Sequence, residues 1–402
     1  MKPADRPSIP QLLAGLDEVE LTVEKLVAGG EGLARHEGAP IFLPRTAPGD
    51  RVRARLVERR PDYGRAEVIE LLAPGPGRRE PPCPYFRDCG GCDLQHLEDQ
   101  LQVRLKAEAV RETLRRVGRI ELPSRFEVVA GEMWGYRLRT QLHTARDAAG
   151  RVQVGYFARG SNTLVPVRLC PILSPALEAE LPGLPERLES GGGELPARLD
   201  LLAGDGGAVT ASPLAGDLPH GEVTLTVGEF AYRLDARSFF QAHRGLVGRL
   251  VTTAVGEWSG ERAADLYAGV GLFSLPLARR YGSVLAVEGD AVAARYARGN
   301  ARRQGGGRVE VVAQAVESWV RELPAGLDRV VVDPPRGGLL PAVRRALLAK
   351  TPARLTYVSC HAATLARDLR ELLAAYRLEA LSLFDLFPQS GHMESVAQLV
   401  RQ

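Results

Sequence analysis

Five cysteines carry much of the chemical information in this 402-residue sequence, and their spacing divides them into three groups. Cys83, Cys89 and Cys92 stand close together in PPCPYFRDCGGCDLQ, Cys170 stands alone in RLCPIL, and Cys360 ends the apolar run LTYVSC. Three close cysteines with a remote fourth are typical of a metal site in a protein whose thiols stay reduced. The fifth cysteine is a candidate nucleophile.

The spacing of the first four cysteines leaves the kind of metal open. Structural zinc is normally held by paired C-x2-C units, and only Cys89 and Cys92 have that spacing. A C-x2-C pair and a Cys-Pro step, as at Cys170, also occur in iron–sulfur sites. Cys83, Cys89, Cys92 and Cys170 are therefore predicted to hold either zinc or an iron–sulfur cluster.

Cys360 stands between a strand-like run and HAATLARDL, which is typical of the beginning of a helix. A thiol at a helix N-terminus is expected to have a lowered pKa and to react as the thiolate. A lone cysteine is more commonly a buried structural residue, so the interpretation of Cys360 as a nucleophile depends on the motifs around it.

A strand, a glycine turn and a helix are predicted over RAADLYAGVGLFSLPLARR, where Gly269 and Gly271 let a ligand approach the backbone closely. Glu288 ends the next predicted strand, at the spacing from Asp265 of an acid that binds ribose hydroxyls. Asp333 ends a third strand in VVVDPPRGG, at the edge of the sheet where ligands bind. The third glycine of a dinucleotide site is missing, which together with the DPPR loop favours S-adenosylmethionine over NAD.

The remaining sequence predicts the elements that position these motifs. Residues 17–72 alternate apolar and polar positions, which predicts four or five strands of a small β-barrel with Arg51, Arg53 and Arg55 on a basic outer surface. A linker follows at 73–82, and a helix is predicted over 97–118 with Gly118 as its C-cap. Three strands are predicted within 136–169. From about 226 onwards strands and helices alternate, which predicts βαβ units and a mainly parallel sheet.

The predicted fold class is therefore α/β, with a Rossmann-like domain that follows two smaller domains in the sequence. The expected domains are a β-barrel over 1–75, an α+β middle domain over 76–225 and a catalytic domain over 226–402. The middle domain cannot be assigned in detail over 173–225, which is rich in Gly, Pro and Leu.

Charge and hydropathy limit the classes of protein. The net charge is only +3, but residues 101–170 hold 13 Lys and Arg against 6 Asp and Glu. This basic stretch indicates either contact with a polyanion or a solvated helix face. No apolar run is long enough for a transmembrane helix, and the N-terminus lacks the apolar core of a signal peptide. The sequence thus predicts a cytoplasmic protein.

Four motifs in this order, DLYAGVGLFSLPLA, VVDPPRGG, YVSCHAATLARDL and DLFPQSGHMESV, resemble those of the RNA 5-methyluridine methyltransferases. The cysteine pattern resembles the iron–sulfur branch of that family, and residues 17–72 resemble its TRAM domain, a barrel of the oligonucleotide-binding kind. The resemblance implies transfer of a methyl group from S-adenosylmethionine to carbon 5 of a uridine. It also favours a 4Fe-4S cluster over zinc.

Carbon 5 of uracil is a poor nucleophile, so the reaction needs a thiolate that adds to carbon 6 and a base that removes the carbon 5 proton. The resemblance implies that Cys360 is the nucleophile and Glu394, in SGHMESV, the base. A surface helix carboxylate is the alternative interpretation of Glu394. His392 either orients the site or is structural.

The resemblance further implies that Gln241, Tyr267, Glu288 and Asp333 bind the cofactor, while Arg336 contacts RNA phosphate or the active-site loop. The chain departs from the family pattern at three places. His243 replaces a common Asn, Leu272 replaces a polar residue after the second glycine, and His361-Ala362 replaces a step that usually ends in Pro.

The implied partner is structured RNA, with large-subunit (23S) ribosomal RNA favoured and the T-loop uridine of transfer RNA as the alternative. The target base must leave its stack to meet the thiol. No DNA or membrane partner is expected, and the enzyme is expected to be a monomer. An RNA-binding protein without catalytic activity is disfavoured because Cys360 and Glu394 are both present.

Overall fold

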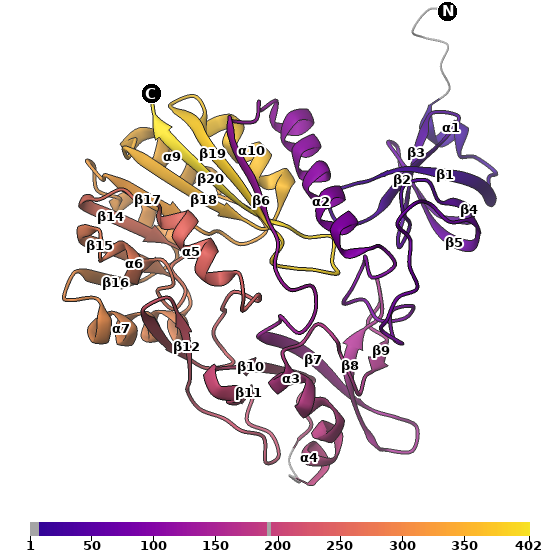
Figure 1. The fold of residues 1–402 in the computed structure, drawn as a ribbon, viewed down its shortest axis with the longest axis horizontal. Coiled ribbons are helices and arrows are strands. Elements are labelled where there is room, and N and C mark those ends of the chain that lie inside the picture. The colour runs from indigo at the N-terminus through magenta and orange to yellow at the C-terminus, as the bar shows by residue number, and fades with distance from the viewer. Residues whose placement is uncertain (1–7, 191–193) are drawn as a thin grey trace, which may run out of the picture. The chain divides into compact units, whose positions relative to one another are not determined.

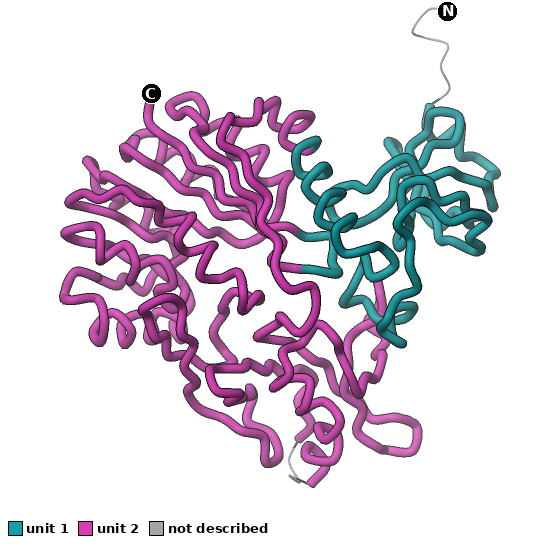
Figure 2. Tube along the Cα trace, viewed as in Figure 1, with its two compact units in different colours: residues 1–112, 388–392 teal, residues 113–387, 393–402 magenta. Residues whose placement is uncertain are grey.

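The structure is a computed structural model that describes residues 8–190 and 194–402, and the chain forms two compact units (Figure 1). Unit 1 comprises residues 1–112 together with 388–392, and unit 2 comprises 113–387 with 393–402 (Figure 2). The first seven residues, which begin the N-terminal stretch without the apolar core of a signal peptide, lie outside the described residues. A short segment from near the C-terminus thus belongs to the unit formed by the N-terminal part of the chain.

In the described part of unit 1, five strands close into a barrel in the order β1-β2-β3-β5-β4, which confirms the predicted barrel. A short helix, α1 (Ile9–Leu12), precedes it. Alternate residues fill its interior, among them Val52, Ala54 and Leu56. The strands are β1 (Glu18–Leu26), β2 (Gly32–His36), β3 (Ala39–Leu43), β4 (Arg51–Arg59) and β5 (Gly64–Ala73).

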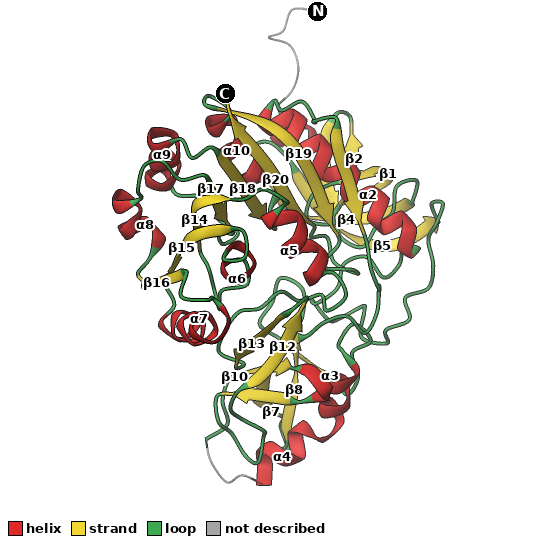
Figure 3. Ribbon diagram, turned by 60° about the vertical axis from the view of Figure 1, so that its left-hand side comes forward, coloured by secondary structure: helices red, strands yellow, loops and turns green. Residues whose placement is uncertain are grey.

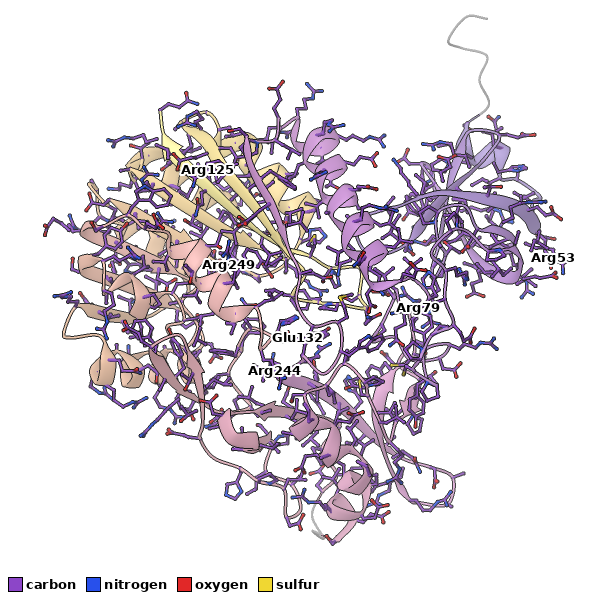
Figure 4. The ribbon with its side chains drawn as sticks, viewed as in Figure 1. Arg53, Arg79, Arg125, Glu132, Arg244 and Arg249 are labelled. Atoms are coloured by element: carbon purple, nitrogen blue, oxygen red, sulfur yellow. The ribbon has the colours of Figure 1, made fainter. Side chains whose placement is uncertain are left out.

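The outer face of β4 carries arginines, as predicted, but the surface around them is mixed in charge rather than basic. Arg53 forms an ion pair with Glu70 of β5, and Arg51 lies 3.8 Å from Glu20 of β1 (Figure 4, Arg53). Exposed pairs of this kind contribute little to stability, but the carboxylates reduce the positive potential that the arginines offer to a phosphate.

The predicted helix 97–118 is shorter in the structure. Helix α2 spans Asp99–Thr113 and is followed by one wide π-helical turn, Leu114–Gly118. The left-handed residue that ends this turn is Arg119, with φ 54°, and not Gly118. Close packing explains the glycine, because a Cβ on Gly118 would lie 2.6 Å from Ile120 Cδ1.

Unit 2 is built on a sheet that has eight strands among the described residues, in the order β16-β15-β14-β17-β18-β20-β19-β6. Strands β16 to β18 are parallel, as the βαβ pattern predicted, and β20 is antiparallel to β18. The strands are β14 (Gly260–Leu266), β15 (Tyr281–Glu288), β16 (Val309–Ala313), β17 (Arg329–Val332), β18 (Arg354–Ser359), β19 (Tyr376–Phe384), β20 (Glu394–Arg401) and β6 (Arg125–Val129).

Helices cover both faces of this sheet, as right-handed crossovers require (Figure 3). Those that precede or follow the first parallel strands are α5 (Val247–Val255), α6 (Ser274–Leu277) and α7 (Ala291–Gln304). Those of the later crossovers are α8 (Val316–Trp319), α9 (Pro341–Lys350) and α10 (Ala362–Leu372). This arrangement is the Rossmann-like fold expected for the C-terminal part.

Strand β6 differs from the expectation for residues 76–225. It pairs in parallel with β19 and so completes the sheet of the C-terminal part, although its residues fall in the proposed middle domain. Its run of apolar residues is short and half-buried, so nothing in its own sequence indicates its partner.

The rest of that region forms a second, five-stranded sheet in the described residues, in the order β11-β10-β7-β8-β9. Three of its strands confirm those predicted within 136–169, namely β7 (Arg139–Arg146), β8 (Val152–Phe157) and β9 (Leu164–Pro166). The stretch without an assignment supplies α3 (Pro175–Glu180), α4 (Leu184–Ser190), β10 (Arg198–Ala203) and β11 (Val209–Ser212). A hairpin of β12 (Val223–Val227) and β13 (Phe230–Leu234) leads to α5.

No helix among the described residues combines the length and the apolar character that crossing a membrane requires.

Candidate active site

The predicted catalytic and cofactor residues meet at one edge of the large sheet. Glu288 ends β15, Asp333 follows β17 and Cys360 follows β18, so all three lie at the carboxyl ends of parallel strands. Glu394 begins β20, which is antiparallel, and therefore lies at the same edge. Open α/β sheets bind their ligands at this edge.

The glycine turn after β14 is held against the carboxylate of Glu288. The N–H of Gly269 donates to Glu288 Oε2 at 2.7 Å, and the N–H of Asp290 donates to Oε1 at 2.6 Å. Gly269 and Gly271 have φ of 55° and 93°, a conformation that favours glycine. The remaining lone pairs of the carboxylate can accept from two hydroxyl groups, as a ribose would offer.

Tyr267, the predicted cofactor residue before this turn, has an unusual backbone with φ of 65°. Its hydroxyl donates to Glu317 Oε1 of α8 at 2.7 Å. Burial and the neighbouring Glu317 carboxylate raise the pKa of Tyr267, so the ring stays neutral. Sequence reasoning missed Glu317, because its helix has four residues and no motif.

Asp265, the first residue of the D-x-x-x-G-x-G pattern, is fully buried. From the sequence, it has no predicted role beyond its spacing from Glu288. Ser274 Oγ donates to its Oδ2 at 2.5 Å, whereas its Oδ1 has no hydrogen-bond partner among the described residues. Burial raises the pKa of Asp265 to about 7. An acceptor buried in this way is a candidate contact for a cofactor ammonium group.

Asp333 is joined to Gln241, another predicted cofactor residue. Gln241 Nε2 donates to Asp333 Oδ2 at 3.3 Å, and Gln241 Oε1 is buried without a partner among the described residues. Burial and the charge of Asp265 raise the pKa of Asp333 to about 7, while the bond from Gln241 lowers it. The two side chains thus present one amide oxygen and one carboxyl to a ligand.

The three departures from the family pattern are accommodated by local packing. The ring of His243 stacks on Tyr136 at 4.8 Å, and its Nε2 lies 3.0 Å from the carbonyl oxygen of Glu132 (Figure 4, Glu132). Leu272 is buried, and its carbonyl accepts from the hydroxyl of Tyr232 at 2.9 Å. His361 replaces the rigid turn with a helix cap.

Cys360 lies at the predicted strand-to-helix turn, one residue beyond β18 and two before α10. His361 Nδ1 accepts from the N–H of Thr364 at 3.3 Å, and the hydroxyl of Ser359 accepts from the N–H of His361 at 3.2 Å. These bonds hold the backbone on either side of the thiol.

The expected lowering of the Cys360 pKa is wrong for this structure. Burial is the largest effect and, with the neighbouring carboxyls of Glu394 and Asp333, raises the pKa of Cys360 to about 11. Arg336 acts in the opposite direction, through its charge and a hydrogen bond to the thiol. Desolvation and the neighbouring negative charges therefore determine the direction of the shift in the Cys360 pKa.

Glu394 is buried, which excludes the alternative interpretation as a surface carboxylate. Ser395 of β20 pairs with Ser359 of β18, and the two strands are antiparallel. The next position in this register therefore sets Glu394 opposite Cys360. Burial and the charge of Asp333 raise the pKa of Glu394 well above its usual range, while Arg336 lowers it. Among the described residues its Oε1 has no hydrogen-bond partner.

Arg336, a minor candidate in the sequence, is the cation that acts on both groups. The DPPR loop that carries it is tied to α10. Thr364 Oγ1 donates to the Arg336 carbonyl at 3.2 Å, and Arg367 donates to the Gly337 carbonyl at 2.9 Å. Helix α10 thus holds both the DPPR loop and the turn that carries the Cys360 thiol.

The four predicted metal ligands are divided between the units. Cys83, Cys89 and Cys92 lie in the loop before α2 in unit 1, and Cys170 lies in unit 2, with Tyr156 Oη 3.9 Å from its sulfur. Within residues 8–190 and 194–402, no three His, Cys, Asp or Glu side chains are grouped as metal ligands. His392 belongs to unit 1, whereas Glu394 belongs to unit 2.

Comparison with known proteins agrees with this geometry. The family model described as tRNA (Uracil-5-)-methyltransferase matches residues 217–402, and that of the TRAM domain matches 17–69. A Pectobacterium atrosepticum protein, "23S rRNA (uracil(1939)-C(5))-methyltransferase RlmD", is 35% identical over 94% of this chain and 92% of its own. The protein of the same name from Cronobacter sakazakii is 35% identical over 95% of this chain and 96% of its own.

A solved structure is similar over the same length. It is the tRNA (uracil-54, C5)-methyltransferase of Pyrococcus abyssi in complex with S-adenosyl-L-homocysteine, with a TM-score of 0.73 and 25% identity. The match covers 94% of this chain and 100% of that one. From the barrel, the sheet and these relatives together, the chain belongs to the RNA uracil-5-methyltransferases, enzymes that depend on S-adenosylmethionine.

Proposed function

We propose that this enzyme forms 5-methyluridine in large-subunit ribosomal RNA, at the uridine that corresponds to 1939 in the relatives' names. The observation that carries this proposal is the 35% identity to two such enzymes over more than nine-tenths of both chains. The T-loop uridine of transfer RNA is the second candidate, because the similar solved structure is a tRNA (uracil-54, C5)-methyltransferase. A ribosomal RNA substrate would place the enzyme in the cytoplasm.

The residues at the sheet edge support a covalent route. The Cys360 thiolate adds to carbon 6 of the flipped uracil, and the electron pair that this addition places on carbon 5 takes up the methyl group. Glu394 then removes the carbon 5 proton, the ring double bond re-forms, and the thiolate leaves. S-adenosylmethionine, when bound, would supply the methyl group from its sulfonium and leave as the neutral thioether S-adenosylhomocysteine.

For the cofactor, we propose that Glu288 accepts from the ribose hydroxyls and that Gln241 and Asp333 bind the methionine end. Tyr267, fixed by Glu317, would border the adenine or methionine portion. Asp265 Oδ1, which has no partner among the described residues, adds a buried acceptor to this set. The proposed site thus has polar groups for both ends of the cofactor.

The proposed substrate is tested by methylation of unmodified RNA. Purified enzyme and methyl-labelled S-adenosylmethionine are incubated with transcripts of 23S ribosomal RNA and of transfer RNA, and the labelled position is mapped by mass spectrometry. We expect label at one uridine of the 23S transcript, and none with Cys360→Ala. Label confined to the T-loop of transfer RNA would contradict the proposed substrate and leave the chemistry intact.

We also propose that Cys83, Cys89, Cys92 and Cys170 hold a 4Fe-4S cluster with a structural role. The donor set is compatible with this proposal, because four thiolates suit both zinc and such a cluster, and the resemblance of the cysteine pattern to the iron–sulfur branch of the family favours the cluster. The N–H of Gly91 lies 3.4 Å from Cys89 Sγ, and N–H···S bonds of this kind stabilise cluster thiolates. Arg45 donates to the carbonyls of Arg87 and Cys89 and adds positive charge to the loop.

The cluster is tested by metal content. Protein purified without oxygen is expected to be brown and to hold about four irons per chain. Cys170→Ser is expected to lose the iron and much of the stability, whereas Cys360→Ser, the matched control, is expected to keep it. Stoichiometric zinc without iron would identify a zinc site, and equal loss of iron in both variants would contradict the division of the cysteines.

A further inference from the structure

Residues 388–392, here called the tether, connect two strands of unit 2 but belong to unit 1 (Figure 2). Strand β19 ends at Phe384 and β20 begins at Glu394. Between them the chain leaves its own sheet, packs into the other unit and returns at Met393. The proposed base is therefore the second residue after the tether.

Gln389, which is fully buried, makes several of the hydrogen bonds that hold the tether. Its carbonyl accepts from the N–H groups of Asp93 and Leu94 at 2.8 and 3.0 Å. Gln389 also forms two hydrogen bonds with the side-chain amide of Gln102 on α2. Gln102 Nε2 donates to Gln389 Oε1 at 2.9 Å, and the backbone N–H of Gln389 donates to Gln102 Oε1 at 3.2 Å. Gln389 Nε2 also donates to Asp99 at 3.3 Å.

The backbone of the tether is strained and tightly fitted. Gln389 has φ of 66°, which costs about 1 kcal/mol or more for a residue that is not glycine and persists only where the surroundings enforce it. A Cβ on Gly391 would clash with the carbonyl carbon of Gly29 in the barrel. The N–H of Gly391 donates to Asp93 Oδ2 at 2.9 Å. Strain of this kind is concentrated at functional sites.

Glu394 is fixed from both sides, and one side is the tether. The ladder of β20 holds it from the C-terminal side, beginning with the pair of Ser395 and Ser359. On the other side Gly391 is three residues away, which is about 10 Å of extended chain at most. Cys360 instead lies between β18 and α10, and in the sequence it is far from the tether. A shift of the tether therefore reaches the base and leaves the nucleophile in place.

We propose that Gln102 of unit 1, acting through Gln389, is a positioning residue for Glu394 and so controls the removal of the carbon 5 proton. The contacts that carry this role lie within unit 1, close in the sequence to the cysteine-rich loop, since Asp93 directly follows Cys92. The packing of the tether within unit 1 thus controls how fast Glu394 removes the carbon 5 proton and the RNA is released. This inference rests on the proposed role of Glu394.

The test is a single-turnover reaction of the full-length enzyme with methyl-labelled S-adenosylmethionine and unmodified 23S RNA, quenched in denaturant. Label in the RNA–protein adduct and label in released RNA are counted separately. Gln102→Ala is expected to form the methylated adduct within about twofold of the normal rate but to release it about 10- to 100-fold more slowly, because a base displaced by about 1 Å is that much less effective.

Asp50→Asn is the matched control. Asp50 is buried in the same unit and accepts from Ala47, Gly75 and Arg78, so its replacement loosens unit 1 without a contact to the tether. Release is expected to be normal in this variant. Gln102→Glu keeps the size but sets a carboxylate oxygen against the oxygens of Leu97 and Gln389, to which the amide donates, and is expected to slow release at least as much as Gln102→Ala.

Glu394→Gln serves as the reference for a missing base. If it accumulates the adduct while both Gln102 variants release RNA normally, or if they slow adduct formation and release equally, the role of the tether is overturned and that of Glu394 stands. If Glu394→Gln accumulates no adduct, the proposed base is wrong, and the inference falls with it.

Discussion

A Glu394→Gln enzyme is expected to become trapped on its RNA, whereas Cys360→Ala is expected never to attach to it. Without the thiol no electron pair is placed on carbon 5, so Cys360→Ala binds both substrates and forms no adduct. An amide in place of the Glu394 carboxylate cannot accept the carbon 5 proton, so the Glu394→Gln enzyme adds and methylates but stalls before elimination. We expect turnover to fall by about 100-fold or more in both variants.

The buried setting of Glu394 makes this substitution clean. Glutamine keeps the size and one acceptor oxygen of the buried side chain that it replaces, so the packing around residue 394 is retained. The Glu394 charge is also one of the effects that raise the pKa of Cys360, and its removal therefore favours the thiolate. Adduct formation should be at least as fast as in the unaltered enzyme.

The measurement is denaturing electrophoresis of RNA labelled in its methyl group or backbone. A band of methylated RNA–protein adduct is expected only for Glu394→Gln. RNA with 5-fluorouridine at the target should trap the unaltered enzyme in the same way, because fluorine cannot leave as a proton does. Substantial turnover by Cys360→Ala, or a fluorouridine crosslink to another residue, would contradict the assignment of the nucleophile.

Much of the fold followed from local patterns in the sequence. The barrel could be predicted because its strands alternate regularly, as in RVRARLV, where every second residue is buried. The parallel sheet could be predicted because Gly269, Gly271 and the apolar strands before Glu288 and Asp333 carry their own signals. Such patterns depend on neighbours along the chain, which a single sequence contains.

The parts that depend on distant partners could not be predicted. Strand β6 gains its place from β19, more than 200 residues later, and no pattern in RFEVV announces this pairing. The tether is part of the motif DLFPQSGHMESV, but its membership of unit 1 depends on the fit between Gly391 and Gly29. Packing of this kind is visible only in three dimensions.

The electrostatics of the site failed to follow from sequence for the same reason. The helix N-terminus after Cys360 was correctly predicted, since α10 begins at Ala362. Burial and the carboxyls of Glu394 and Asp333 nevertheless raise the pKa of Cys360, and neither effect can be read from YVSCHAATL. The influence of Arg336 likewise depends on its loop lying beside the thiol in space.

Removal of the Arg336 charge is expected to slow adduct formation and to move the midpoint of its pH profile to higher pH. Arg336 lowers the pKa of both Cys360 and Glu394, so Arg336→Gln moves the pKa of the thiol above its present value of about 11. Below that pKa the thiolate fraction falls about tenfold for each further unit by which the pKa rises. We expect adduct formation at neutral pH to fall by about 10- to 100-fold, with the rate still rising at the highest pH that the protein tolerates.

The pH profile of adduct formation in a single turnover separates this role from the alternative one. Arg336→Lys keeps a positive charge and is the matched control, expected to lie between Arg336→Gln and the unaltered enzyme because an ammonium group makes fewer fixed hydrogen bonds. If Arg336 instead contacts an RNA phosphate, Arg336→Gln leaves the midpoint of the pH profile at saturating RNA unchanged, and the dependence of RNA affinity on salt becomes shallower. A shift of the pH midpoint to higher pH, with unchanged salt dependence of RNA affinity, would show that Arg336 acts on the thiol and the base. The same cation then stabilises both the thiolate that attacks carbon 6 and the carboxylate that removes the proton.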